Sequence, residues 1–216
     1  MRRRKGKKSP ELNIPPGQRI AIVGSAGSGK TTLAQQLAEK MGIPHIELDA
    51  VYWQEQWTPC TPEEFRAKVY EATQGECWII DGNYSKIRDI TWSQADTLIW
   101  LDYKIPVVFR RLGRRTLTRL FRKRTLLQCN RAAWKQQFIG RKAQFWQMVR
   151  SYRKRRREYP QMLNQPEYAH LTVIRLRSPR EAKKWLNAQF PSEKKKSRFK
   201  QIPRLKRPRL RRGRPS

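Results

Sequence analysis

The feature that most constrains how this chain folds is a glycine-rich segment that lies between an apolar run and an amphipathic stretch. Residues 19–23 read Arg-Ile-Ala-Ile-Val, residues 24–31 read Gly-Ser-Ala-Gly-Ser-Gly-Lys-Thr, and residues 31–41 carry apolar side chains at four-residue spacing. The apolar run favours a buried strand, and the four-residue spacing favours a helix with one face against a sheet. The order strand, turn, helix therefore predicts an α/β domain.

The same segment matches GxxxxGK[ST], a pattern that binds nucleotide phosphates. Its glycines allow backbone N–H groups to turn inward around phosphate oxygens, and the positive end of the following helix adds to the attraction. We expect Lys30 to neutralise the outer phosphates of ATP and the Thr31 hydroxyl to coordinate Mg²⁺. An ordinary glycine-rich connection is the alternative, but the complete pattern between strand and helix favours nucleotide binding. The predicted nucleotide contacts are Gly24, Ser25, Ala26, Gly27, Ser28, Gly29, Lys30, Thr31 and Thr32.

Four further segments have the composition of buried strands. They are short, mostly apolar and separated by stretches with helical spacing, as in a parallel sheet with helices on both faces. Helix starts that carry a proline, at 59–64 and 178–181, fit this alternation. The predicted fold class is therefore three-layer α/β with a five-stranded parallel sheet. The strands are expected at 19–23, 45–48, 77–80, 97–101 and 171–176.

Three of these strands run directly into an aspartate, namely Asp49, Asp81 and Asp102. Ligands of open parallel sheets collect at the carboxyl ends of the strands, so these carboxylates are candidates for function. We assign Asp81 to the outer shell of the magnesium ion and Asp49 to positioning the acceptor or to general-base work. The alternative is that an aspartate at a strand end only caps a turn, and this structural reading is strongest for Asp102.

The charge of the chain, +32 at pH 7, is distributed very unevenly. Residues 10–103 carry 7 basic and 13 acidic side chains, whereas residues 104–157 carry 19 basic and no acidic ones. The stretches 1–16 and 191–216 are dominated by lysine and arginine, so we predict that both are disordered tails until a polyanion binds them. A single folded domain is accordingly predicted over residues 17–190.

The composition also bounds the compartment. The longest apolar runs are a few residues, far short of the roughly 20 that cross a bilayer, so no membrane partner is expected. The three cysteines are an odd number without a close pair, which fits neither a disulfide framework nor a metal cluster. We therefore predict reduced thiols and a cytoplasmic protein.

Three segments together resemble a known group of proteins. With the glycine-rich loop at 24–31, the sequence Leu-Asp-Ala-Val-Tyr-Trp at 48–53 and the strand Trp-Ile-Ile-Asp-Gly-Asn-Tyr at 78–84, the chain is similar to adenylate-kinase-like P-loop NTPases. More narrowly, it resembles the bacterial DNA topology modulation proteins, over roughly residues 18–190. The resemblance implies a P-loop NTPase fold with a helical, arginine-rich lid at about 110–157, and a small kinase that uses ATP and Mg²⁺.

The resemblance also implies roles for individual residues. Arg110, Arg111, Arg114 and Arg115 fall where adenylate kinases begin the lid, and Arg111, Arg114 and Arg115 are taken as catalytic together with Lys30 and Asp49. Arg177 falls at the loop that contacts adenine in those kinases. The usual Phe-Pro-Arg after Asp-Gly is replaced here, and the acidic lid residue is missing, which disfavours AMP as the acceptor. The predicted acceptor contacts are Asp49, Tyr52, Asn83, Tyr84 and Arg88.

Two functions remain open at this point. The first is a small kinase that transfers the ATP γ-phosphoryl group to a nucleotide, a nucleoside or a similar acceptor that the sequence does not identify. The second is an ATP-binding regulator associated with nucleic acid, with little or no transfer activity. The 19 basic residues at 104–157 exceed what ATP and one acceptor phosphate need, which indicates contact with DNA or RNA through the lid and the tails. A solvated charged helix is the plainer interpretation.

Overall fold

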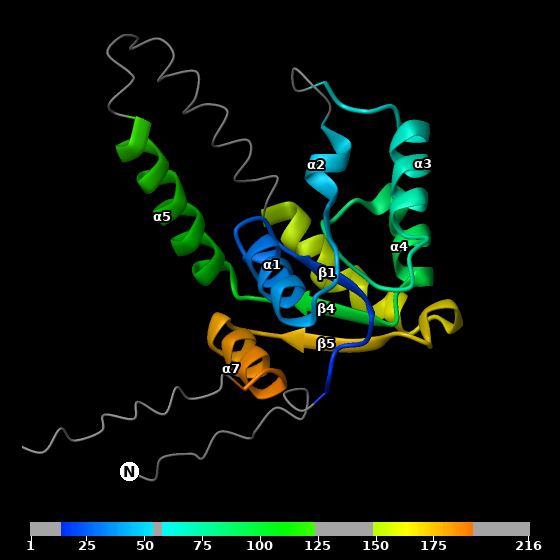
Figure 1. The fold of residues 1–216 in the computed structure, drawn as a ribbon. Coiled ribbons are helices and arrows are strands. Elements are labelled where there is room, and N and C mark those ends of the chain that lie inside the picture. Colours follow the sequence, from blue (N-terminus) through cyan, green and yellow to red (C-terminus); the bar gives the residue numbers. More distant parts are fainter. Residues whose placement is uncertain (1–13, 54–57, 124–148, 192–216) are drawn as a thin grey trace, which may run out of the picture.

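A computed structural model describes residues 14–53, 58–123 and 149–191, with side chains of α5 described as far as residue 114. Both tails and the middle of the predicted lid lie outside these ranges. Figure 1 shows one sheet between two groups of helices. The strands are β1 (Arg19–Gly24), β2 (His45–Glu47), β3 (Trp78–Asp81), β4 (Thr97–Leu101) and β5 (Thr172–Leu176). The α-helices are α1 (Lys30–Met41), α2 (Leu48–Tyr52), α3 (Pro62–Ala72), α4 (Arg88–Gln94), α5 (Ile105–Lys123), an unlabelled helix over 149–163 and α7 (Pro179–Gln189). Short 3₁₀ turns lie at Ser85–Ile87 and Pro166–Tyr168.

The five strands form one parallel sheet in the order β2-β3-β1-β4-β5, which confirms the predicted fold class. The central strand, β1, pairs with β3 on one side and β4 on the other, with Ile22 opposite Asp81 and Ile99. Because all strands run in the same direction, their carboxyl ends meet at one edge, where the glycine-rich loop leaves β1. The chain also changes direction across the sheet at β1, because β2 and β3 lie on one side of it and β4 and β5 on the other.

The two faces of the sheet bury different halves of each strand. Residues of one parity, such as Ile20 and Ile22, pack against α1, α7 and the beginning of α5. Residues of the other parity, such as Ala21 and Val23, pack against α3, α4 and the helix over 149–163. Apolar side chains on both faces explain why the strands read as continuous apolar runs in the sequence.

Most strands differ from the prediction by one residue at an end, and two boundaries differ for a visible reason. The strand expected at 45–48 ends at Glu47, because Leu48 already begins α2 and is buried under it. The helix expected near Pro59 begins at Pro62, because Thr61 and Glu64 form a capping box, in which each side chain bonds the other's backbone N–H. Pro59 instead lies in an isolated β-bridge with Trp53. Among the described residues, no helix is both long and apolar enough to span a membrane.

Candidate functional site

The glycine-rich loop has a backbone conformation that depends on its glycines. Gly27 and Gly29 have φ angles of 77° and 94°, in the left-handed region that favours glycine. Gly29 is the N-cap of α1 and supplies no side-chain hydrogen bond to the first turn. The first N–H groups of α1 therefore lack a side-chain cap, which fits a site for phosphate oxygens at a helix N-terminus. Ser28 adds a buried hydroxyl for which the described residues offer no hydrogen-bond partner.

Thr31 and Asp81 lie together where the predicted magnesium site would be. The Thr31 hydroxyl donates to Asp81 Oδ2 at 2.8 Å, across the gap between α1 and β3. The other oxygen of Asp81 is 2.8 Å from His45 Nε2, on β2. Asp81 is only 3% exposed. The Thr31 hydroxyl and the His45 imidazole both contact its carboxylate and fix its orientation. Oxygen ligands next to a phosphate-binding loop suit Mg²⁺, and Thr31 and Asp81 are the residues that could hold it.

Asn83 fastens the end of β3 to the start of the loop. Its Oδ1 accepts a hydrogen bond from the backbone N–H of Gly24 at 3.0 Å, and its Nδ2 donates to the carbonyl oxygen of the same residue. The side-chain amide thus pairs with Gly24 as a neighbouring strand would. We predicted that Asn83 contacts the acceptor, whereas both ends of its amide are engaged with the loop.

The residue after Asn83 turns toward the predicted acceptor side. Tyr84 donates its phenolic hydrogen to Asp49 Oδ1 at 2.8 Å, so the end of β3 and the short helix α2 are joined across this edge of the sheet. Burial, followed by the hydrogen bond to Asp49, raises the pKa of Tyr84. The phenol therefore stays protonated near neutral pH and acts as a donor to Asp49. Tyr52, the last residue of α2, contacts the Tyr84 ring with the centroids 5.1 Å apart.

The predicted arginines are distributed over several surroundings. The Arg111 guanidinium lies against the loop, since a Cβ placed on Gly29 would be 2.9 Å from its Nη2. Arg114 is exposed on the same helix, and the side chain of Arg115 lies outside the described part. Arg177 has an exposed side chain, and its backbone N–H donates to Glu181 at the start of α7. Of these predicted contacts, Arg111 lies against the phosphate-binding loop.

Arg88 does not join the acceptor residues. Its guanidinium lies over the rings of Trp92 and Tyr159, at 5.0 Å and 5.3 Å from their centroids. A delocalised, weakly hydrated cation packs well on aromatic faces, and this contact places it between α4 and the helix over 149–163. The resemblance suggested Arg88 because it is the arginine nearest to the replaced Phe-Pro-Arg, and the 3₁₀ turn Ser85–Ile87 lies between it and Asn83.

Arg155 belongs to the basic run 153–157 and contacts the loop residue Ser25 although it lies 130 residues after it. Its Nη2 lies 3.4 Å from Ser25 Oγ, and burial lowers the pKa of the guanidinium. The signal was present in the helical spacing, since Arg155 is three residues after the buried Tyr152 and four before the buried Tyr159. It therefore lies on the inward face of its helix.

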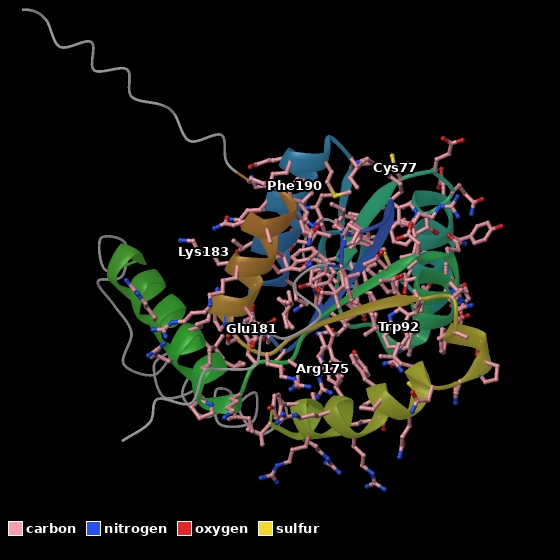
Figure 2. The ribbon with its side chains drawn as sticks, turned by 90° about the horizontal axis from the view of Figure 1, so that it is seen from below. Cys77, Trp92, Arg175, Glu181, Lys183 and Phe190 are labelled. Atoms are coloured by element: carbon pink, nitrogen blue, oxygen red, sulfur yellow. The ribbon has the colours of Figure 1, made fainter. Side chains whose placement is uncertain are left out.

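The third strand-end aspartate, Asp102, is paired with arginines. Arg175 contacts Asp102 Oδ2 through Nη2 at 2.6 Å, and Arg156 Nε lies 3.4 Å from Oδ1. The Arg175 guanidinium also lies 4.2 Å from the Trp100 ring centroid, and Figure 2 shows this arginine between β5 and the helix over 149–163. Two cations neutralise this buried carboxylate, in agreement with the structural alternative.

The sequence analysis assigned no role to His45, whose ring contacts Asp81, the candidate metal-binding carboxylate.

Comparisons with known proteins bear on this site. A family model described as ABC transporter matches residues 8–102, less than half of the chain, and that range includes the loop. A shikimate kinase from Synechococcus elongatus is 33% identical over 112 residues, which cover 44% of this chain and 58% of that kinase. A cytidylate kinase from Thermosipho africanus is 59% identical over 34 residues, 16% of this chain and 15% of that kinase. The chain thus matches little more than half of the length of the shikimate kinase.

Solved structures of small kinases are similar over most of the chain, at low identity. A shikimate kinase from Acinetobacter baumannii in complex with shikimate has a TM-score of 0.45 and 18% identity, covering 82% of this chain and 96% of that one. A gluconokinase from Sinorhizobium meliloti has a TM-score of 0.44 and 16% identity, covering 82% and 93%. The chain carries the P-loop pattern on a five-stranded parallel sheet and is similar in sequence to small kinases. The narrower likeness to DNA topology modulation proteins stays a prediction.

Proposed function

We propose that this protein is an ATP-dependent kinase that transfers the γ-phosphoryl group to a hydroxyl of a small acceptor held at Asp49. The observation that carries the proposal is the continuous contact from the loop to this carboxylate. Asn83 bonds the backbone of Gly24, and the next residue, Tyr84, bonds Asp49. Consecutive Cα atoms are about 3.8 Å apart, so one short segment sets the spacing between the phosphate-binding loop and the acceptor carboxylate.

The residues of the loop would hold the triphosphate of ATP. Lys30 neutralises the outer phosphates, and the uncapped N–H groups of α1 bind their oxygens. Thr31 and Asp81 would hold Mg²⁺, which supplies charge neutralisation and polarisation of the transferred phosphoryl group. Arg111 lies against Gly29 and Arg155 near Ser25, so both guanidinium groups can contact phosphate oxygens held by the loop.

The transfer itself needs a positioned hydroxyl and a place for its proton. The acceptor oxygen forms a bond to the γ-phosphorus, the bond between that phosphorus and the bridging oxygen breaks, and ADP leaves. Asp49 accepts the hydroxyl proton or orients the hydroxyl for attack. Tyr84 occupies Oδ1 of Asp49 and fixes its orientation, so Oδ2 is the oxygen left for the acceptor. Positioning and charge neutralisation account for most of the expected acceleration.

The decisive experiment is an acceptor assay with matched variants of the full chain. Labelled Mg-ATP and a panel of nucleosides, nucleotides, sugars and hydroxy acids should yield a labelled product with the wild type. Lys30→Ala should lower kcat/KM by about a thousandfold, because it removes a charge that counts most in the transition state. Lys40→Ala, at the opposite end of α1, is the control and should leave the rate unchanged. A Lys30→Ala variant as active as the wild type would refute the proposal.

A second candidate function, an ATP-binding regulator associated with nucleic acid, is favoured by one surface. Arg150, Arg153, Lys154 and Arg157 are exposed on the helix over 149–163, and Figure 2 shows nitrogen-tipped side chains leaving that helix away from the sheet. Such a face suits phosphate backbones. Under this alternative no acceptor is labelled in the same assay, and DNA or RNA binds with an affinity that falls steeply with salt.

A further inference from the structure

Four aromatic side chains gather beside Asp49 and are called the aromatic cluster here: Tyr52, Trp53, Phe65 and Tyr84. The Tyr52 ring contacts Trp53 at 5.3 Å and Phe65 at 5.1 Å between centroids, both nearly edge to face. Phe65 also contacts Tyr84 at 4.9 Å. Three separate segments, the end of α2, α3 and the turn after β3, therefore converge on one patch. Since Tyr84 bonds Asp49, the patch adjoins the acceptor carboxylate.

The cluster runs from the core to the surface. Phe65 is buried, Tyr52 and Tyr84 are partly buried, and Trp53 is 41% exposed. In the part of the chain that the structure describes, Trp53 and Tyr70 are the two large apolar side chains with such exposure. Leaving an indole in water is unfavourable, and covering it with a planar ligand recovers that free energy. Trp53 thus provides an aromatic surface at the outer end of the acceptor side.

Three cations near the cluster in sequence have partners outside it, whereas Lys86, two residues after Tyr84, is exposed. Arg66, next to Phe65, forms an ion pair with Asp89 at 2.6 Å. Lys68 lies 3.6 Å from the sulfur of Cys60, and Arg88 stacks on Trp92. An anionic group of an acceptor would need a cationic partner where water is excluded. The groups that contact the cluster are aromatic rings and one carboxylate, and that carboxylate repels an anion.

We propose that the acceptor is an uncharged hydroxyl compound with a planar ring, of the nucleoside class, whose ring stacks on Trp53 and Tyr52 and whose hydroxyl reaches Asp49. The inference rests on the kinase function proposed above and specifies its substrate. The acceptor oxygen forms the new bond to the γ-phosphorus, ADP leaves with the bridging oxygen, and Asp49 takes the proton. Trp53 and Tyr52 act on binding, because they contact the ring and not the reacting atoms.

The test compares ring-bearing and ring-free acceptors in the full chain with Mg-ATP. The four ribonucleosides are assayed beside shikimate, D-gluconate and the nucleoside 5′-monophosphates. Trp53→Ala should raise the KM for a nucleoside about tenfold and leave the KM for ATP unchanged, because stacking on an aromatic ring contributes that much to base binding. Trp53→Phe keeps an aromatic face and should recover most of the loss. Tyr70 on α3 is the other exposed aromatic residue, so Tyr70→Ala is the matched control and should change neither the KM for the nucleoside nor the KM for ATP.

The outcomes separate this inference from the kinase proposal. Phosphorylation of shikimate or gluconate in preference to nucleosides, with Trp53→Ala without effect, leaves the kinase standing and overturns the planar acceptor. A lower KM for the 5′-monophosphates than for the nucleosides overturns the uncharged acceptor. If no compound is phosphorylated, calorimetric titration of nucleosides into the Mg-ADP complex decides. Binding that weakens in Trp53→Ala supports a ring site without the kinase, and no binding overturns both.

Discussion

The ends of β3 and β4, which lie on either side of β1, carry two aspartates that look alike in the sequence and differ in the structure. Asp81 is the last residue of the buried strand β3, Asp102 directly follows the buried strand β4, and each is 3% exposed. The carboxylate of Asp81 contacts a hydroxyl and an imidazole, whereas that of Asp102 contacts two guanidinium groups. The same local sequence therefore leads to two different electrostatic environments.

The difference in partners distinguishes a candidate functional carboxylate, Asp81, from a structural one, Asp102, which is called the clamp below. Two cations already neutralise Asp102, so its charge contributes to holding β4, β5 and the helix over 149–163 together. The Asp81 carboxylate contacts a hydroxyl and an imidazole, and its charge would attract a cation brought by the nucleotide. A buried carboxylate beside a phosphate-binding loop points to function when its partners are dipoles, and to architecture when they are guanidinium groups.

The sharpest way to break this comparison is to remove the charge of Asp81. We expect Asp81→Asn to lower kcat/KM with Mg-ATP by about a hundredfold and to raise the Mg²⁺ concentration needed for half-maximal rate, because the metal loses a charged neighbour. The free energy of unfolding should change by no more than about 1 kcal/mol, since asparagine keeps the size and the hydrogen bonds. Initial rates across a Mg²⁺ series and urea denaturation measure the two effects. Loss of stability with normal activity would make Asp81 a clamp as well.

The reciprocal change is Asp102→Asn. We expect it to lower the free energy of unfolding by about 2–3 kcal/mol, because two guanidinium groups lose the charge that compensates their burial, while Arg175 and Arg156 remain partly exposed and limit the loss. Urea denaturation measures this loss, and kcat/KM should stay within about threefold. The double variant Asp102→Leu with Arg175→Met, which removes the carboxylate together with its nearer guanidinium group, should recover part of the stability. A variant that keeps its stability and loses activity would move Asp102 to the site.

How far the sequence predicts each part follows from how local the interactions are. The loop is eight consecutive residues, so its pattern alone predicted the turn, the helix and their position at the sheet edge. The partners of Asp81 and Asp102 come from distant segments, and an isolated histidine such as His45 carries no sign in the sequence that it will meet a carboxylate 36 residues away. Arg155 and Ser25 are 130 positions apart. Helical spacing indicates which arginine of the run faces inward, but the sheet order decides what it meets.

The smallest effect should come from a third carboxylate, Asp89, which calibrates the role of burial. It pairs with Arg66 on the surface, with the two side chains 55% and 42% exposed, and the hydrogen bond from that arginine lowers the pKa of Asp89. A lowered pKa in the folded state stabilises the protein above the unfolded value, near pH 4, and the contribution is lost as the pH falls through the folded value. Asp89→Asn should therefore destabilise slightly at pH 7, much less than Asp102→Asn, because water screens the exposed pair. The difference from the wild type should disappear at pH 2–3. Urea denaturation of both variants from pH 2 to 7 measures this, and equal losses would show that burial does not explain the contrast between clamp and surface pair.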